Sequence, residues 1–222
     1  IYGKNKGEAV LEGLIIIPKS SQVTFKHLTI KPTGQLYVEG EAIFEDCHFS
    51  GESTAVNLSL NNGKARLINC TIEHAADIGV ALLNDSQATV KNCVFSNNGK
   101  AHVLLENSKL TIDNSELHNA KHAFWIKNNS AVEAENVSLH HQSGTQVIVQ
   151  HDSIFTDKNS RITNGLGNGL YATKNCDISL FNTHLEDHQL PQIWIQNSKL
   201  FAKDCEVLRG AESGIMLREL TE

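Results

Sequence analysis

Apolar and polar residues alternate along most of the chain in short segments that recur at a fixed spacing. One such unit holds three alternating segments, at 103–105, 110–112 and 115–117. Alternation with a period of two predicts β-strands, because successive side chains of a strand point to opposite faces. Almost no segment shows helical spacing, and the chain has only 3 prolines. The pattern therefore predicts an all-β chain with three short strands in each repeat.

Two columns of polar residues keep the period of this repeat, which is 22 or 23 residues. In the first column, an Asn or Asp precedes a small residue, any residue and an apolar residue, at Asp46, Asn69, Asn92, Asn114, Asn136, Asn159, Asn182 and Asp204. The second column comprises Asp85, Asn107, Asn129, Asp152, Asn175 and Asn197. Two columns with one spacing predict a solenoid of about nine to ten rungs, in which every rung adds one strand to each of three parallel sheets.

The alternation also predicts which side chains point into the coil. For the first sheet these are Val80/Leu82, Val103/Leu105, Phe124/Ile126, Val147/Val149, Leu170/Ala172, Ile193/Ile195 and Ile215/Leu217. For the second sheet they are Leu67, Val90, Ile112, Ala134, Leu180 and Ala202. For the third sheet they are Ile72, Phe95, Leu117, Leu139, Ile162, Leu185 and Val207.

These repeats resemble the right-handed parallel β-helix repeats of the pectate-lyase-like superfamily. The first polar column resembles that family's asparagine ladder, at the tight turn between the second and third sheets. Asn suits this turn because it tolerates left-handed backbone geometry and can bond to the same residue one rung away. The resemblance covers about residues 20–222 and implies a single right-handed β-helix domain over residues 1–222. Residues 1–20 would form the first rung or an N-terminal cap, and we expect the domain to be excised from a longer protein.

Composition narrows the classes of partner. The net charge of −6 argues against nucleic acid, which demands a basic face. No apolar stretch reaches the roughly 18 residues of a membrane span. The 5 cysteines are odd in number and scattered, which favours a reducing compartment, so we predict a cytoplasmic location with a secreted or cell-surface one left open. No motif calls for a cofactor.

The family's enzymes hold polysaccharide along the outer face of the first sheet, between long loops. Here the loops that lead into this sheet, such as 97–100 and 187–191, are short, and the family's catalytic motifs are missing. Charged residues on the face fall on separate rungs, at Glu106, Lys127 and Arg218. We therefore expect a non-catalytic interaction or scaffold domain that binds a protein partner or another domain of the same polypeptide. The alternative is a carbohydrate-binding or polysaccharide-degrading module, a lyase or hydrolase, that uses the same face.

The outward positions of the first sheet predict where binding occurs. One column carries an apolar and aromatic stripe, Leu104, Trp125, Ile148, Tyr171, Trp194 and Met216, which follows Ser59 and Ala81. The neighbouring column is a mostly polar margin, Leu83, Glu106, Lys127, Gln150, Thr173, Gln196 and Arg218. An apolar strip of this extent is typical of a binding surface. The alternative is a register slip of one residue, which would put both tryptophans inside the coil.

Three further features have structural and functional interpretations. His118 and His140 share an outward column on adjacent rungs, which makes them weak metal-ligand candidates against a default of solvated polar residues. Cys47, Cys70 and Cys93 share an inward column that favours small residues, which indicates buried structural thiols. Asp157 falls in the inward column of the second sheet, where a carboxylate is costly. A local bulge that shifts the register is the favoured explanation, and a buried functional acid is the other.

Overall fold

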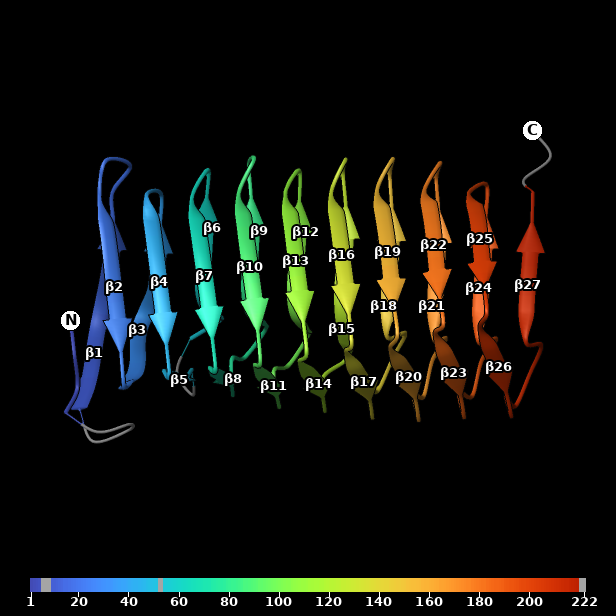
Figure 1. The fold of residues 1–222 in the computed structure, drawn as a ribbon, viewed down its shortest axis with the longest axis horizontal. Coiled ribbons are helices and arrows are strands. Elements are labelled where there is room, and N and C mark those ends of the chain that lie inside the picture. Colours follow the sequence, from blue (N-terminus) through green and yellow to red (C-terminus); the bar gives the residue numbers. More distant parts are fainter. Residues whose placement is uncertain (5–8, 52–53, 220–222) are drawn as a thin grey trace.

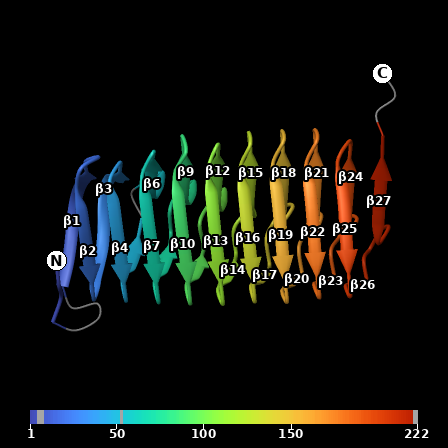
Figure 2. The same ribbon diagram turned by 45° about the horizontal axis from the view of Figure 1, so that its top comes forward.

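The computed structural model describes residues 1–4, 9–51 and 54–219. Within these residues the chain winds into a solenoid whose strands all pair in parallel with the equivalent strands of the neighbouring rungs. Figure 1 shows the rungs in sequence order from blue to red, with the two termini at opposite ends. The turned view in Figure 2 shows the strands of the three sheets stacked along one axis. The predicted all-β solenoid with three parallel sheets is confirmed.

Each rung crosses the three sheets in turn. The first sheet contains β6 (Val56–Asn61), β9 (Ile78–Leu83), β12 (Ala101–Glu106), β15 (His122–Lys127), β18 (Val147–Gln150), β21 (Leu170–Thr173), β24 (Ile193–Gln196) and β27 (Ile215–Arg218). The second contains β2 (Gln22–Lys26), β4 (Glu41–Glu45), β7 (Lys64–Ile68), β10 (Gln87–Lys91), β13 (Lys109–Asp113), β16 (Ala131–Glu135), β19 (Ile154–Lys158), β22 (Asp177–Phe181) and β25 (Lys199–Lys203). The third contains β5 (His48–Ser50), β8 (Thr71–Glu73), β11 (Val94–Ser96), β14 (Glu116–His118), β17 (Ser138–His140), β20 (Arg161–Thr163), β23 (His184–Glu186) and β26 (Glu206–Leu208). The longer β1 (Ala9–Ile17) and β3 (Leu28–Val38) each run through third-sheet and first-sheet positions. Residues 9–17 therefore belong to the first rung; Glu8, from the segment predicted as a rung or cap, lies outside the described residues.

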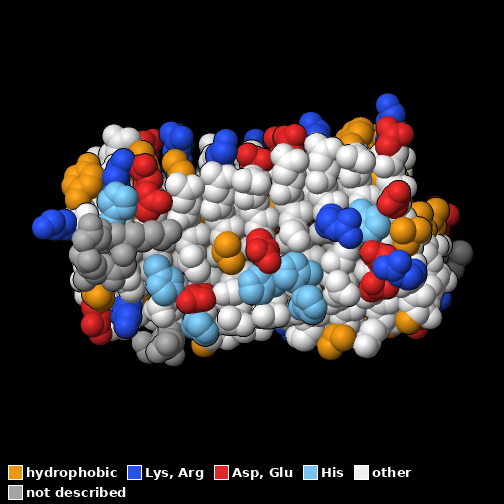
Figure 3. Space-filling model, turned by 60° about the horizontal axis from the view of Figure 1, so that its bottom comes forward, with side chains coloured by type: hydrophobic (Ala, Val, Ile, Leu, Met, Phe, Trp, Pro, Cys, Tyr) orange, Lys and Arg blue, Asp and Glu red, His pale blue; other side chains and the backbone are white. Residues whose placement is uncertain are grey.

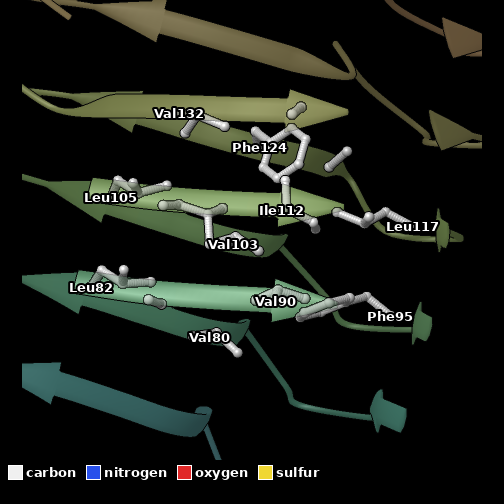
Figure 4. Close-up of a cluster of buried hydrophobic side chains, with 14 of the residues drawn as sticks. Val80, Leu82, Val90, Phe95, Val103, Leu105, Ile112, Leu117, Phe124 and Val132 are labelled. Carbon is white, nitrogen blue, oxygen red and sulfur yellow. The ribbon is translucent and has the colours of Figure 1, made fainter. Parts of the chain in front are cut away.

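The predicted inward columns meet inside the coil. Figure 4 shows Val103 and Leu105 of the first sheet facing Ile112 of the second and Leu117 of the third. These side chains are almost completely buried. The stacking continues from rung to rung because the strands pair without a register shift, as in β12 against β9 and β15. Only in the last described rung are the inward side chains exposed, with Leu217 at 70 %.

The asparagine ladder lies where it was predicted, between the second and third sheets. Its residues adopt left-handed backbone conformations with φ between 49° and 58°, and the structure adds His27 to the column at its start. The ladder amides bond from rung to rung, as in Asn92 Nδ2 to Asn69 Oδ1 at 3.1 Å and Asn114 Nδ2 to Asn92 Oδ1 at 2.7 Å. These turns lie at the surface, where the ladder side chains join neighbouring rungs by hydrogen bonds.

The cysteine column is buried and structural, and it has a requirement beyond small size. Cys70 Sγ donates to Ile68 O at 3.3 Å, and the Cys70 amide donates to Cys93 Sγ at 3.3 Å. Ser115 takes the same position one rung later and accepts from the Cys93 amide at 3.0 Å. Each hydroxyl or thiol thus links two backbone groups across a turn. Hydrogen bonding with Cys70, together with burial, raises the pKa of the Cys47 thiol, so these groups remain protonated.

Asp157 points into the coil, and the predicted bulge is wrong. β19 pairs residue by residue with β16 and β22, and this places Asp157 between Ala134 and Leu180. The residue is 1 % exposed, and Thr183 Oγ1 donates a 2.6 Å hydrogen bond to its Oδ2. Burial raises the pKa of the carboxyl to about 6, although hydrogen bonds from Thr183 and Ser160 oppose this shift. The acid is thus accommodated by partial hydrogen bonding and not by a change of register.

Candidate binding site on the outer face of the first sheet

The stripe lies on the outside of the first sheet, in the register that the alternation predicted. Trp125 pairs with Leu104 on one side and with Ile148 on the other, and Trp194 pairs with Tyr171. Both tryptophans are half-buried, while the residues that flank Trp125 along β15 are 0 % exposed. The alternative register, with the indoles inside the coil, is therefore wrong.

The column of the stripe begins earlier than the sequence analysis placed it. Ile16 pairs with Tyr37, which pairs with Ser59 and through it with Ala81. Ile16 is 58 % exposed, whereas Ser59 and Ala81 are small and buried. The first rungs were missed because β1 and β3 are long strands with an irregular register near Gly13, so they do not match the 22-residue spacing. Because Ser59 and Ala81 interrupt the column, its larger apolar side chains form a continuous row only from Leu104 to Met216.

Two aromatic residues of the stripe hold glutamine side chains of the margin on the next rung. Trp125 Nε1 donates to Gln150 Oε1 at 3.1 Å, and Tyr171 OH donates to Gln196 Oε1 at 3.0 Å. In both cases the bond uses the amide oxygen and orients the side chain, while the amide Nε2 makes no hydrogen bond of its own within the described residues. We call these the aromatic–amide pairs. Each places a half-buried aromatic ring beside two amide N–H donors, which suits a ligand with both apolar faces and hydroxyl groups.

Charges gather at the Trp125 end of this face. The ammonium groups of Lys100 and Lys127 lie 5.8 Å and 5.4 Å from the centre of the Trp125 ring. Lys127 also pairs with Glu106 at 3.2 Å. From Ile148 to Trp194, the stripe and margin carry only uncharged side chains. Glu106 is the one carboxylate in the stripe and margin as defined, whereas glycoside hydrolysis uses two.

A buried polar column lies behind this face, at the corner between the third and first sheets, and the sequence analysis missed it. On alternate rungs the corner holds two larger polar side chains, Asn98/His102, Gln142/Gln146 and His188/Gln192. The rungs between them carry small residues, Ala75/Gly79, Ala120/Ala123, Gly165/Gly169 and Gly210/Gly214. The structural repeat at this corner is therefore two rungs long. The signal was present in the sequence, since Gln142, Gln146 and Gln150 recur as His188, Gln192 and Gln196.

The polar pairs of the corner bond to each other and to backbone carbonyls. Asn98 Nδ2 donates to His102 Nδ1 at 3.0 Å and to Ile72 O at 3.1 Å. Gln146 Nε2 donates to Thr163 O at 2.7 Å and to Nε2 of His188 at 2.9 Å. Burial lowers the pKa of His102 to about 3, so its imidazole is neutral at physiological pH. The corner thus links rungs two apart through neutral polar groups.

The small residues at the corner make room for these polar pairs, so enlarging one should destabilise the fold. A β-carbon at Gly165 would lie 2.8 Å from Cδ2 of His188 and 3.0 Å from Nε2 of Gln146. We expect Gly165→Ala to lower the free energy of unfolding by about 1–3 kcal/mol, the usual range for overpacking a well-packed interior. Urea denaturation measures this change. Gly34→Ala is the control, because its β-carbon would lie 4.0 Å from the nearest atom, on Leu14. An equal effect of the two substitutions would contradict the packing argument.

Histidines and acids share the outer face of the third sheet, where Figure 3 shows them side by side. The rings of His118 and His140 stack with centroids 5.2 Å apart and planes within 2°, as their shared column predicted. His140 Nε2 lies 2.8 Å from Glu116 Oε1, and its Nδ1 lies 2.6 Å from Nδ1 of His141. In the part of the chain that the structure describes, no three His, Cys, Asp or Glu side chains form a group suited to a metal ion. No helix among the described residues is long and apolar enough to cross a membrane.

Parallel rungs, three sheets and a left-handed asparagine ladder define a parallel β-helix with a half-buried aromatic stripe on the outer face of one sheet. The chain belongs to the right-handed β-helix family, whose model "Right handed beta helix region" matches residues 4–139 and 101–221. No curated protein matches the chain.

Solved structures with a similar fold have remote sequences. The A-module of mannuronan C-5 epimerase AlgE6 from Azotobacter vinelandii aligns over 98 % of this chain and 91 % of its own, at 9 % identity and a TM-score of 0.53. Pectate lyase Pel9A aligns over 96 % of this chain and 68 % of its own, at 13 % identity and a TM-score of 0.40. An endo-xylogalacturonan hydrolase from Aspergillus tubingensis covers 93 % of this chain and 85 % of its own, at 10 % identity and a TM-score of 0.35. At these identities the likeness concerns the fold alone.

Proposed function

We propose that this β-helix is a non-catalytic binding domain whose stripe holds an extended carbohydrate chain. The observation that carries the proposal is the pair of aromatic–amide contacts, Trp125 with Gln150 and Tyr171 with Gln196. Sugar rings present apolar C–H faces and polar edges, so they need a flat apolar surface with hydrogen-bond donors at its side. The stripe supplies the surface, and the margin supplies amide donors already held in place. Preorganised side chains lower the entropy lost on binding.

The arrangement of the face favours binding over catalysis. A sugar-cleaving site on this scaffold would need two carboxylates near the scissile bond, or an equivalent acid and base. The stripe and margin supply a single carboxylate, Glu106, which is already paired with Lys127. The A-module of the epimerase AlgE6, which has a similar fold, is named for its action on mannuronan. For this chain we propose that the outer face of the first sheet binds carbohydrate and does not catalyse a reaction.

A protein partner, or another domain of the same polypeptide, is the second candidate function. The observation that favours it is the aliphatic part of the stripe, formed by Leu104, Ile148 and Met216. Apolar side chains of this kind contribute to protein interfaces, where tryptophan and tyrosine are also enriched. A protein ligand would be bound by the whole stripe, whereas a sugar chain would depend on the aromatic–amide pairs.

Substitution of one tryptophan tests whether the stripe binds glycan or only contributes to the structure. We expect Trp125→Ala or Trp194→Ala to weaken glycan binding at least tenfold, which corresponds to about 1.4 kcal/mol, because each removes a ring face from the site. Binding is measured on a glycan array and then by calorimetry with the glycans that bind. The matched control is Phe201→Ala, which removes an aromatic side chain that is 54 % exposed on the outer face of the second sheet.

The same variants decide between the two candidate functions. If the unmodified protein binds no glycan, the carbohydrate proposal is wrong. If it then captures a protein from an extract of its source, and both tryptophan variants release that protein, the second candidate replaces the first. If Phe201→Ala weakens glycan binding as much as Trp125→Ala does, the stripe is not the binding site.

A further inference from the structure

The donors of the proposed site repeat every second rung, not every rung. Gln150 lies on β18 and Gln196 on β24, with Thr173 on β21 between them. Strands in a sheet are about 4.8 Å apart, so the two amides are separated by roughly 9.6 Å along the axis of the coil. Trp125 and Tyr171, the aromatic partners of these amides, lie two rungs apart as well. The site therefore contains two copies of one unit, each two rungs long.

The buried corner supports the same period independently. Gln150 and Gln196 belong to the rungs that carry the larger corner pairs, Gln142/Gln146 and His188/Gln192. On each of these rungs, three polar side chains follow one another at intervals of four residues, from the buried corner to the half-buried margin. The rung between them carries Gly165 and Gly169 at the corner and Thr173 at the margin. The two-rung period is thus present at the buried corner as well as at Gln150 and Gln196 in the margin.

We infer that the stripe binds a neutral β-1,4-linked polysaccharide in an extended conformation, with its axis along the coil and one disaccharide per two rungs. This inference rests on the proposed function and specifies its ligand. In an extended β-1,4-linked chain, successive sugars are turned over relative to each other, so the same hydroxyl edge faces the same side at every second sugar. Equivalent donors are then needed once per disaccharide. Gln150 and Gln196 provide donors at that spacing, and Tyr171 lies on the rung between them.

The charge distribution selects a neutral chain. Between Ile148 and Trp194, neither the stripe nor the margin carries a charged side chain that would pair with a carboxylate on every sugar or disaccharide. The positive charges lie at the two ends, with Lys100 and Lys127 at one and Arg218 at the other, and Lys127 is already paired with Glu106. The chain as a whole has a net charge of −6, which repels polyanions. An acidic polysaccharide would place its carboxylates beside neutral amides and gain little from them.

Calorimetry with defined oligosaccharides tests the inference on the intact chain. The probes are β-1,4-linked glucose, mannose and N-acetylglucosamine oligomers of two, four and six sugars, with β-1,3-linked glucose oligomers, oligogalacturonate and oligomannuronate for comparison. We expect at least one neutral β-1,4-linked series to bind tightest. Its affinity should rise about tenfold or more from two to four sugars, because the tetrasaccharide reaches both amides. The β-1,3-linked and acidic oligomers should bind at least tenfold more weakly.

Substitutions that remove the donor but keep the acceptor isolate the role of the amides. Gln150→Glu and Gln196→Glu each retain an oxygen for Trp125 Nε1 or Tyr171 OH but lose the amide N–H groups inferred to donate to the ligand. Each should weaken binding of the tetrasaccharide about tenfold and abolish the gain from two to four sugars, and the double variant should weaken it about 100-fold. Gln87→Glu makes the same change on the exposed face of the second sheet and should have no effect.

The outcomes separate this inference from the proposed function. If acidic or β-1,3-linked oligomers bind tightest and Trp125→Ala weakens them, the stripe binds carbohydrate but the inferred ligand is wrong. The inference also fails if a neutral β-1,4-linked series binds with no step between two and four sugars, or with a step that the glutamate variants leave intact. If no oligosaccharide in the panel binds, both the inference and the carbohydrate function are wrong.

Discussion

Asp157→Asn is expected to raise the free energy of unfolding by about 3 kcal/mol at pH 7.5 and to leave it nearly unchanged at pH 3.5. The carboxyl is 1 % exposed inside the second sheet, and burial raises its pKa from 3.8 to about 6. Each pKa unit corresponds to 1.36 kcal/mol, so the shift of about two units amounts to about 3 kcal/mol. An amide keeps an acceptor for the 2.6 Å hydrogen bond from Thr183 without the ionisable group.

The direction of this effect follows from which state holds the proton more tightly. Between pH 3.8 and about 6, the folded protein keeps Asp157 protonated, while the unfolded chain releases the proton. Stability from this group is therefore fully present at or below pH 3.8 and is lost as the pH rises through 6. Acids paired with cations show the opposite behaviour, since a partner that stabilises the charge lowers the folded pKa. Here hydroxyl groups are the partners, and they do not outweigh desolvation.

Urea denaturation at pH 3.5, 5 and 7.5 measures the effect. The control is Asp177→Asn, which removes an exposed acid of the same sheet that lies 3.5 Å from Lys199. An exposed ion pair contributes about 0–1 kcal/mol, so this control should change stability little at any of these values. If Asp157→Asn has the same effect at pH 3.5 as at pH 7.5, Asp157 does not titrate as a buried acid.

The repeat allowed most of the fold to be predicted, because the physical demand on each position recurs in every rung. The ladder from Asp46 to Asp204 needs left-handed backbone at one turn of each rung, and Asn or Asp meets this need with little strain. The outward register of Trp125 and Trp194 followed from alternation alone. Features that depend on a single rung were harder to predict. Asp157 seemed too costly to bury because a pattern of apolar and polar positions does not show that Thr183 donates a hydrogen bond to it.

The two-rung period was missed for a different reason. Aligning rungs one by one treats all rungs as equivalent, so an alternation between neighbouring rungs looks like noise. Gly165 and Gln142 occupy equivalent corner positions on adjacent rungs. Gly165 is small because the larger side chains of Gln146 and His188, on the rungs on either side, fill the space beside it. The aromatic–amide pairs were missed because the contact joins positions 25 residues apart, two places further than the rung spacing. Side-chain length, which sets this reach, does not appear in a pattern of apolar and polar positions.

His102→Gln is expected to make the protein more resistant to acid, by up to about 5 kcal/mol near pH 3. The imidazole is 0 % exposed at the corner, next to Asn98 and with its ring centre 6.2 Å from that of Phe95. Burial lowers its pKa from 6.5 to about 3. Above pH 6.5 the imidazole is neutral in both the folded and the unfolded protein, so its titration does not lower the free energy of unfolding. As the pH falls from 6.5 to 3, the unfolded chain takes up a proton that the folded protein excludes, and stability is lost.

Glutamine is a suitable replacement because Gln146 and Gln192 occupy the same corner position two and four rungs later. The comparison of wild type and His102→Gln by urea denaturation at pH 7.5, 5 and 3.5 gives the size of the effect at each pH. His48→Gln is the control, since the side chain of His48 is 36 % exposed on the third sheet. If His102→Gln loses as much free energy of unfolding between pH 7.5 and pH 3.5 as the wild type does, this imidazole does not limit stability in acid.

The two buried groups act in opposite directions over the same range of pH. As the pH falls from 6 to 4, protonation of Asp157 adds stability and exclusion of a proton from His102 removes it. The pH dependence of wild-type stability therefore shows only the difference between the two effects. In Asp157→Asn the loss of stability in acid should therefore be steeper than in the wild type, and in His102→Gln stability should increase on acidification. The two residues share no hydrogen-bond partner, so the double variant should show the sum of the single effects. A double variant that departs from this sum by more than about 0.5 kcal/mol would mean that the two buried sites are coupled through the coil.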